Sequence, residues 1–243
     1  MTSLDDTAYA AFLSARRAEL LDRIWAAASR AGRDPHEVTL LAVSKTVGAR
    51  EVRLAHSVGY RAFGENRPQE LKRKVAQLAD DAAMAGTRFD MIGNLQTNKI
   101  NQVLGNATLV HSVSSMHLVE ALARRCELRG MVQPCLLEVN VSGEASKSGF
   151  SPDEAFAAAE KVMDSKGLRL DGLMTMAPAG DLRAARVTFS GLRELCDKLR
   201  MHTGAALPVL SCGMSGDFEV AVEEGSTLVR LGRVVFDPGF AGV

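Results

Sequence analysis

The stretch TLLAVSK at residues 39–45 decides the fold, because a short apolar run passes directly into a cation with no turn residue between them. A run of this length and apolar character is typical of a parallel β-strand that is covered on both faces. Similar runs recur along the whole chain. The eight strands predicted in this way are residues 39–44, 60–64, 89–93, 108–113, 134–141, 170–176, 208–210 and 228–231.

Helical patterns separate the predicted strands. Residues 115–130 begin with a serine suited to capping a helix and end at a glycine. The sequence SPDE at residues 151–154 is a helix start, and residues 181–201 carry apolar side chains at helical spacing. A further helix over residues 8–31 precedes the first strand. Its apolar stripe consists of Leu13, Leu20, Leu21, Ile24 and Ala28.

The alternation of strands and helices predicts an α/β fold with a parallel sheet. A (β/α)8 TIM barrel needs about 250 residues, and the chain has 243. An open doubly wound sheet is the alternative, but no GxGxxG motif follows the first strand. We therefore expect one TIM-barrel domain over residues 1–243, with an extra N-terminal helix.

Composition excludes several classes of protein. The 29 basic and 29 acidic side chains balance, which disfavours a dedicated nucleic-acid surface. The four cysteines, Cys126, Cys135, Cys196 and Cys212, form no CxxC pair, so we expect reduced thiols and no metal site. No apolar run approaches the ~20 residues of a membrane span, and the N-terminus lacks a signal core. We expect a cytoplasmic protein.

Functional groups of a parallel barrel lie at the C-terminal ends of its strands. The residues that directly follow the predicted strands are unusually polar for positions beside apolar runs. This set consists of Lys45, Glu65, Asn66, Asn94, Gln96, Ser112, Asn140, Ser142, Met174, Ser215, Arg230 and Gly232.

Lys45 ends the first strand and has two interpretations. A lysine that is desolvated at the barrel mouth becomes an amine nucleophile for an aldehyde. A lysine that extends past the strand end into solvent has no such role. The residue alone leaves both interpretations open.

The loops after the last two strands favour a phosphate site, since barrels commonly bind phosphate there. The seventh strand leads into SCGMSGD at residues 211–217, and the eighth leads into RLGR at residues 230–233. Ser215 offers a hydroxyl and backbone N–H groups, and Gly232 allows close approach of an anion. A nucleophile elbow is disfavoured, because Asp217 replaces the last glycine of GxSxG.

Seven motifs together resemble the pyridoxal 5′-phosphate (PLP) homeostasis proteins, which are PLP-binding proteins of the alanine racemase N-terminal barrel type. The motifs cover nearly the whole chain, and their order and spacing are more specific than any one of them. They are LLAVSKTV, FGENRPQEL, IGNLQTNK, VNVSGEASKSGF, GLMTMAP, CGMSGD and STLVRLG.

The resemblance implies a PLP site. Lys45 is similar to the lysine that forms the internal aldimine, and Asn66 is similar to the residue beside the cofactor ring. Ser215 resembles the serine that binds the phosphate, with backbone N–H groups from Gly232 and Arg233.

Arg230 resembles the arginine that faces the pyridine nitrogen, and Met174 and Met214 would pack near the cofactor. An arginine is always charged and only donates hydrogen bonds, so the ring nitrogen opposite it stays unprotonated. Aminotransferases place an acid there instead. The resemblance therefore implies a cofactor that is poorly suited to carbanion chemistry.

The chain departs from the family pattern at several positions. Arg233 stands in place of a threonine, Asp90 in place of a histidine and Cys212 in place of a methionine, and the C-terminal FDPGFAGV differs from the common ending. These departures bear on affinity more than on the identity of the cofactor.

The resemblance implies a carrier and buffer of PLP that supplies apo-enzymes and influences amino-acid and keto-acid balance. The alternative is a PLP-dependent amino-acid racemase of low activity. Racemases of this barrel type use a second base, a tyrosine, and a second domain, whereas Tyr9 and Tyr60 lie away from the predicted mouth. Lack of that domain favours a monomer. A barrel that binds a sugar phosphate without PLP is a third interpretation.

A polar cluster after the third strand has no assigned role. Helix capping and a solvated face explain it as well as function does. Its members are Asn94, Gln96, Asn98 and Lys99.

Overall fold

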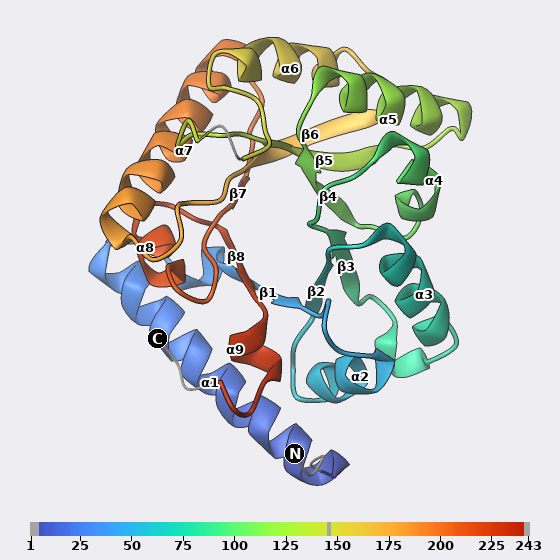
Figure 1. Cartoon of the computed structure of the whole chain (residues 1–243), viewed down its shortest axis with the longest axis vertical. Helices are drawn as coiled ribbons and strands as arrows, with labels where there is room; N and C mark the ends of the chain where they lie inside the picture. Colours follow the sequence, from blue (N-terminus) through green and yellow to red (C-terminus); the bar gives the residue numbers. More distant parts are fainter. Residues whose placement is uncertain (1–4, 145–146, 241–243) are drawn as a thin grey trace.

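The computed structural model describes residues 5–144 and 147–240, and these residues form a closed barrel of eight parallel strands (Figure 1). The strands follow one another in chain order around the barrel, and β8 pairs with β1 to close it. The strands are β1 Thr39–Val43, β2 Ala62–Glu65, β3 Arg88–Met91, β4 Leu109–Val113, β5 Gln133–Glu138, β6 Leu168–Met174, β7 Val209–Ser211 and β8 Leu228–Leu231.

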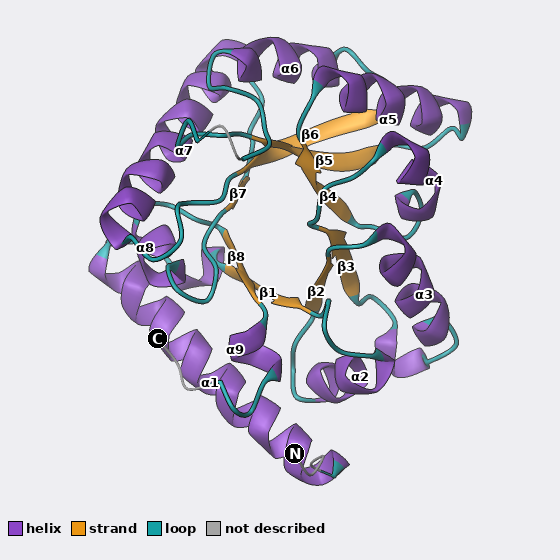
Figure 2. Ribbon diagram, in the orientation of Figure 1, coloured by secondary structure: helices purple, strands orange, loops and turns teal. Residues whose placement is uncertain are grey.

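Helices form a layer around the outside of the barrel (Figure 2). The α-helices are α1 Asp6–Arg30, α2 Ala49–Ser57, α3 Pro68–Leu78, α4 Ile100–Val103, α5 Met116–Leu128, α6 Glu154–Met163, α7 Leu182–Thr203, α8 Phe218–Glu223 and α9 Arg233–Phe236. The 3-10 helices are η1 Pro35–Glu37, η2 Ala82–Met84 and η3 Thr97–Lys99. The predicted TIM barrel with its extra N-terminal helix is confirmed.

The local signals for helix starts act as predicted. The Ser115 hydroxyl accepts a hydrogen bond from the backbone N–H of Leu118 at 3.3 Å, which caps α5. Ser151 and Glu154 form a reciprocal capping box: the Ser151 N–H donates to the Glu154 carboxylate at 2.8 Å, and the Glu154 N–H donates to the Ser151 hydroxyl at 3.3 Å.

The N-terminal helix α1 runs along the outside of the barrel (Figure 1). It packs on α8, α2 and α9, and Leu13, Leu20 and Ile24 are fully buried in that contact. The predicted stripe is therefore the face that covers the neighbouring helices. No helix in the described part of the chain has the length and apolar character needed to cross a membrane.

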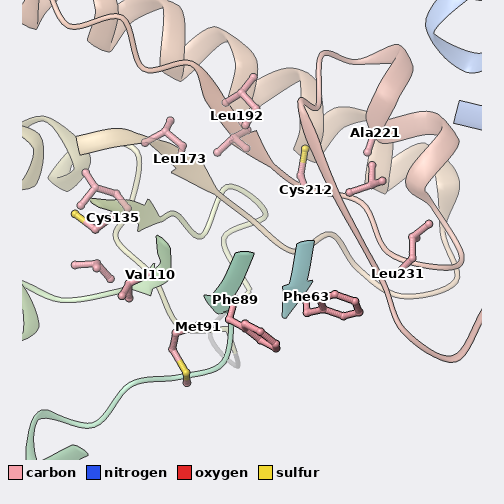
Figure 3. Packing of buried hydrophobic residues seen from close by; sticks show 14 of the residues in the cluster. Phe63, Phe89, Met91, Val110, Cys135, Leu173, Leu192, Cys212, Ala221 and Leu231 are labelled. Atoms are coloured by element: carbon pink, nitrogen blue, oxygen red, sulfur yellow. The ribbon is translucent and has the colours of Figure 1, made fainter. Parts of the chain in front are cut away.

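Alternation along each strand divides the buried side chains into two sets. One set points outward into a large core beneath the helices, where Phe63 and Phe89 lie side by side with ring centroids 5.6 Å apart (Figure 3). The other set points into the barrel and includes the apolar clusters around Leu41 and around Leu136. Inward-facing positions of strands that end at the mouth are thus the positions from which a bound molecule can be reached.

All four cysteines are buried and free of disulfides. Burial raises the pKa of the Cys196 and Cys212 thiols to about 11. These thiols are therefore protonated and unreactive near neutral pH.

Candidate functional site

Lys45 is the second residue after β1, at the C-terminal mouth of the barrel. It continues the alternation of Leu41 and Val43, in which Leu41 points into the barrel. The side chain is exposed, and no described residue forms a hydrogen bond or ion pair with it. Protein atoms alone therefore do not desolvate this amine, and the structure leaves it free to meet a ligand.

A buried network lies behind Lys45, between the barrel and α3; we call Ser44, Glu65 and Lys74 the outer network. The Ser44 hydroxyl donates to Glu65 Oε1 at 2.6 Å. The Lys74 ammonium donates to the same carboxylate oxygen at 2.5 Å and to the Ser44 carbonyl. These contacts fix the backbone of the residue that precedes Lys45.

Arg230 points into the barrel from the end of β8 and is only 5% exposed. Its guanidinium donates to the Ser211 carbonyl and hydroxyl, both at 2.7 Å, and to the Thr175 carbonyl at 3.0 Å. Burial lowers the pKa of Arg230, yet an arginine starts so high that it keeps its charge. The mouth therefore holds a fixed cation.

The contacts of Arg230 continue through the barrel interior. His111 Nδ1 lies 2.9 Å from the Ser211 hydroxyl, and His111 Nε2 lies 2.9 Å from Asp90 Oδ2. Arg88 completes the series, with Nε 2.9 Å from Asp90 Oδ1. We call Arg88, Asp90, His111, Ser211 and Arg230 the inner chain. In the sequence, Asp90 stands out only as a departure from the family pattern, and neither His111 nor Ser211 carries a signal for a role.

Ser215 lies half-buried in the β7–α8 loop. In the described part of the chain neither its hydroxyl nor its N–H has a hydrogen-bond partner. The neighbouring Met214 N–H donates to Asp217 Oδ1 at 2.6 Å, which holds the loop closed. Burial raises the pKa of Asp217. The loop is thus fixed by Asp217, while the groups of Ser215 remain available.

Gly232 and Arg233 begin the short helix α9 directly after β8. No acceptor for their N–H groups occurs among residues 5–144 and 147–240. A Cβ placed on Gly232 would lie 3.5 Å from Val43 Cβ, an ordinary contact. Packing within the protein therefore leaves room at Gly232, on the side where β1 passes beside β8.

Asn66 follows β2 and is half-buried. Its backbone is held tightly, since a Cβ on Gly93 would lie 2.2 Å from the Asn66 carbonyl oxygen. The Ser112 hydroxyl donates to the Gly93 carbonyl at 2.6 Å. The ends of β2, β3 and β4 are therefore tied together, and only glycine fits at the point of contact.

The two predicted methionines occupy different environments. Met174 is 2% exposed and points into the barrel with Leu109 and Leu136, whereas Met214 is 38% exposed on the β7–α8 loop. Met174 therefore lines the barrel interior at the C-terminal end of β6, and Met214 lies on the loop at the mouth.

Two of the predicted site residues, Asn140 and Ser142, form hydrogen bonds within the loop that carries them. Asn140 Nδ2 donates to the carbonyls of Glu144 and Lys147, at 2.8 and 3.2 Å, and Asn140 Oδ1 accepts from the Ser142 hydroxyl at 3.2 Å. The predicted strand 134–141 ends early, at Glu138, because the chain then folds back and Val139 bridges to Phe150. Asn140 and Ser142 shape this return.

Glu138 is a buried residue at the end of β5 that the sequence prediction missed, because the predicted strand continued to residue 141. It is 4% exposed, faces inward beside Met174, and accepts a hydrogen bond from the Ser148 hydroxyl at 2.8 Å. Burial raises the pKa of its carboxyl group, although the charge of Arg230 acts in the opposite direction. Counting inward positions from Leu136 would have found it.

The polar cluster after β3 lies partly on η3, which spans Thr97–Lys99. Asn94, Gln96 and Asn98 are exposed. A cavity of about 320 Å³ lies elsewhere, at the N-terminal end of the barrel, where Thr87 and Gln133 contribute to its lining. This cavity therefore lies at the end of the barrel opposite Lys45 and Arg230.

Residues 18–237 match the family model of the alanine racemase N-terminal domain. A pyridoxal phosphate homeostasis protein of Pseudomonas aeruginosa is 44% identical over 223 residues, which cover 90% of this chain and 92% of the relative. A protein of the same name from Aquifex aeolicus is 39% identical over 222 residues, covering 91% of this chain and 96% of the relative. The chain belongs to the pyridoxal phosphate homeostasis protein family. The resemblance carried by the seven motifs is confirmed.

Solved structures agree with membership in this family. PipY of Synechococcus elongatus, solved with PLP bound, superimposes with a TM-score of 0.79 at 30% identity, covering 92% of this chain and 99% of PipY. A protein of Bifidobacterium adolescentis reaches 0.90 at 40% identity, covering 96% and 98%. Alanine racemase of Corynebacterium glutamicum reaches 0.64 at 17% identity, and this chain covers 59% of it, so that likeness concerns the fold alone.

Tyr60 lies away from the mouth, as the sequence predicted, whereas Tyr9 contacts α9, the short helix that follows β8. Tyr60 precedes β2 at the opposite end of the barrel, and its hydroxyl is buried. The Tyr9 hydroxyl on α1 donates to the Phe236 carbonyl at 2.7 Å. Burial raises the pKa of Tyr9 to about 12, so this hydroxyl is a weak acid held in a structural contact.

Proposed function

We propose that this chain binds PLP covalently through Lys45 and acts in PLP homeostasis as a carrier and buffer. Relatives at 39–44% identity carry the name pyridoxal phosphate homeostasis protein, and the PipY relative has been solved with PLP bound. The proposal extends the binding to this chain and assigns it to named residues.

One observation carries the assignment: a free amine and a set of free N–H groups leave neighbouring strands at the same end of the barrel. Ala42 of β1 pairs with Leu231 of β8. Lys45 follows β1, and Gly232 and Arg233 follow β8, with no acceptor for either N–H group in the described chain. An aldehyde and a phosphate on one small molecule match this pair of groups.

The residues present fit PLP by charge as well. Ser215 would donate its hydroxyl to the phosphate, and Gly232 and Arg233 would add backbone N–H groups. The room that a Cβ on Gly232 would occupy is the kind of space an anion needs against a backbone. Asn66 and Met174 would border the ring from β2 and β6.

PLP, when bound, supplies an aldehyde that exchanges reversibly between amines. Lys45 supplies the amine in the resting protein, and its exposure leaves room for a competing amine to approach. Arg230 faces the mouth and can only donate hydrogen bonds. A ring nitrogen opposite it would have to accept, so Arg230 favours the unprotonated form of that nitrogen. Such a site suits storage and release better than carbanion chemistry.

The wider role follows from this chemistry. We infer that apo-enzymes that depend on PLP are the recipients, and that release affects amino-acid and keto-acid balance. Action as a monomer in the cytoplasm is part of the same proposal.

The test is covalent trapping. The purified protein is incubated with PLP, reduced with borohydride, digested and mapped by mass spectrometry. We expect the pyridoxyl group on Lys45 and its complete loss in Lys45→Ala, with Lys72→Ala as a control that removes an exposed lysine on α3. A pyridoxyl group that persists at another lysine in Lys45→Ala would refute the assignment. Racemisation of alanine by the loaded protein that is lost in Lys45→Ala would favour a racemase.

A further inference from the structure

We propose that Asp90, His111 and Ser211 are positioning residues that hold the guanidinium of Arg230 in one orientation at the barrel mouth. What the guanidinium meets there, the ring nitrogen of PLP, rests on the proposed function. The arrangement of the positioning residues rests on the barrel alone.

The placement of these residues is the first step. Asp90, His111, Ser211 and Arg230 come from β3, β4, β7 and β8, and each shares the inward phase of its strand. The first three are fully buried. Four polar side chains from four strands therefore meet in an interior that is otherwise lined by apolar residues such as Leu41.

The hydrogens of the chain admit one consistent order. Arg230 only donates, so the Ser211 hydroxyl oxygen accepts from it at 2.7 Å. Nε2 of a neutral His111 faces the Asp90 carboxylate and carries the ring hydrogen, so Nδ1 is the unprotonated nitrogen and accepts the Ser211 hydrogen at 2.9 Å. His111 carries its hydrogen on Nε2 and donates it to Asp90 at 2.9 Å.

A charged His111 would break this order, because Nδ1 would then direct a second hydrogen at the Ser211 oxygen. The groups around the ring act both ways: Asp90 favours the charged form, and Arg230 and Arg88 disfavour it. Burial is the largest effect and lowers the pKa of His111. The neutral ring with hydrogen on Nε2 is therefore the form that satisfies every neighbour.

The consequence falls on Arg230. Three donor contacts to Ser211 and Thr175 use part of its fork, and its Nε has no partner among the described residues. A guanidinium held at three points keeps its remaining donors aimed in one direction. On the proposed function, this fixes the donor opposite the ring nitrogen.

The first test needs no cofactor. The apo protein is labelled with ¹⁵N-histidine, and the ring nitrogens are followed by NMR between pH 5.5 and 8 (roughly the range in which free histidine titrates). We expect one ring, absent from His111→Gln, that stays neutral with hydrogen on Nε2. The other histidines, His36, His56, His117 and His202, are not buried and serve as internal controls. A His111 ring that becomes charged within this range, or that carries hydrogen on Nδ1, overturns the proposal.

The second test asks whether the chain acts on the cofactor. Ser211→Ala removes the link between Arg230 and His111, and we expect PLP retention to fall about tenfold, as for one lost hydrogen bond, with a shifted absorption band. Ser226→Ala is the matched control: Ser226 is also fully buried and bonds three carbonyls, but does not contact Arg230. We expect Ser211→Thr, which restores the hydroxyl, to recover the band.

The outcomes separate the two proposals. Equal losses of retention in Ser211→Ala and Ser226→Ala would reduce the chain to a structural role and overturn the inference. Mapping of PLP to a residue other than Lys45 would refute the proposed function while the NMR result for the apo protein stood.

Discussion

The outer network and the inner chain flank the candidate site on opposite sides of the barrel wall. They differ in whether their charges balance. In the outer network the charges of Glu65 and Lys74 neutralise each other within 2.5 Å, and Glu65 Oε2 is buried without a partner among the described residues. The inner chain runs from the partly exposed Arg88 to Arg230 at the mouth. The inner chain holds two guanidinium groups, those of Arg88 and Arg230, and one carboxylate, that of Asp90, so one positive charge remains.

The difference teaches what each network does. A neutral, closed pair beside β1 projects little charge, and its contacts secure a stretch of backbone, the carbonyl of Ser44. A chain with an excess cation at its open end attracts an anion and orients a side chain. The site thus takes its rigidity from one network and its charge from the other.

The largest effect is expected from breaking the outer network. Lys74→Met keeps most of the apolar part of the side chain but leaves the charge of the Glu65 carboxylate buried without a cation. Loss of one partner of a buried pair costs about 3–5 kcal/mol of unfolding free energy, which urea denaturation measures. The double variant Glu65→Leu, Lys74→Met should recover part of the loss, because no charge is then buried. A loss below ~1 kcal/mol, the value of a surface pair, would show that the pair is solvated.

A smaller effect is expected in the β7–α8 loop, which lies beside the positively charged end of the inner chain. Ser215→Ala removes one hydroxyl from a charge-assisted contact, which should weaken PLP retention by about 1.5–3 kcal/mol, roughly 10- to 150-fold. Ser142→Ala is the control, because its hydroxyl bonds Asn140 within the β5–α6 loop. Equilibrium dialysis against PLP measures both. Retention that is equal in the two variants would place the phosphate elsewhere.

The fold and one half of the site could be predicted from the sequence, for a physical reason. Strands covered on both faces are apolar runs, and a polar residue directly after such a run marks the mouth. Lys45 follows the apolar run of β1 in this way, and Ser215 lies in the loop after β7. The role of each residue comes from the family resemblance that the motifs carry. All eight strands were located, with ends that shift by a few residues.

The inner chain could not be predicted in the same way. His111 and Ser211 are 100 residues apart in sequence, and they meet only because the closed barrel brings β4 opposite β7. Register matters too: Asp90 pairs with Leu109 in the ladder, yet its side chain bonds His111, two residues further along. That offset arises from the tilt of strands in a closed barrel. Alternation gives the inward face, but not which inward residues meet.

The smallest effect concerns Glu138, which contrasts with Glu65 because no cation in the described part of the chain contacts it. Burial raises the pKa of its carboxyl group, so the folded state binds this proton more tightly than the unfolded state. The ionised group therefore destabilises the fold as pH rises above the usual value of a glutamate, about 4.3. Glu138→Gln removes that cost, and we expect a gain in the free energy of unfolding at pH 7 that disappears in acid. Urea denaturation at pH 7 and pH 4 measures the difference, with Glu144→Gln, an exposed-loop carboxylate on the same β5–α6 connection, as control.

A gain equal at both pH values would mean that packing against Met174, rather than charge, sets the effect. A loss at pH 7 would mean that the ionised Glu138 is compensated by Arg230 more strongly than burial opposes it. The inner chain would then end in an ion pair, like the outer network.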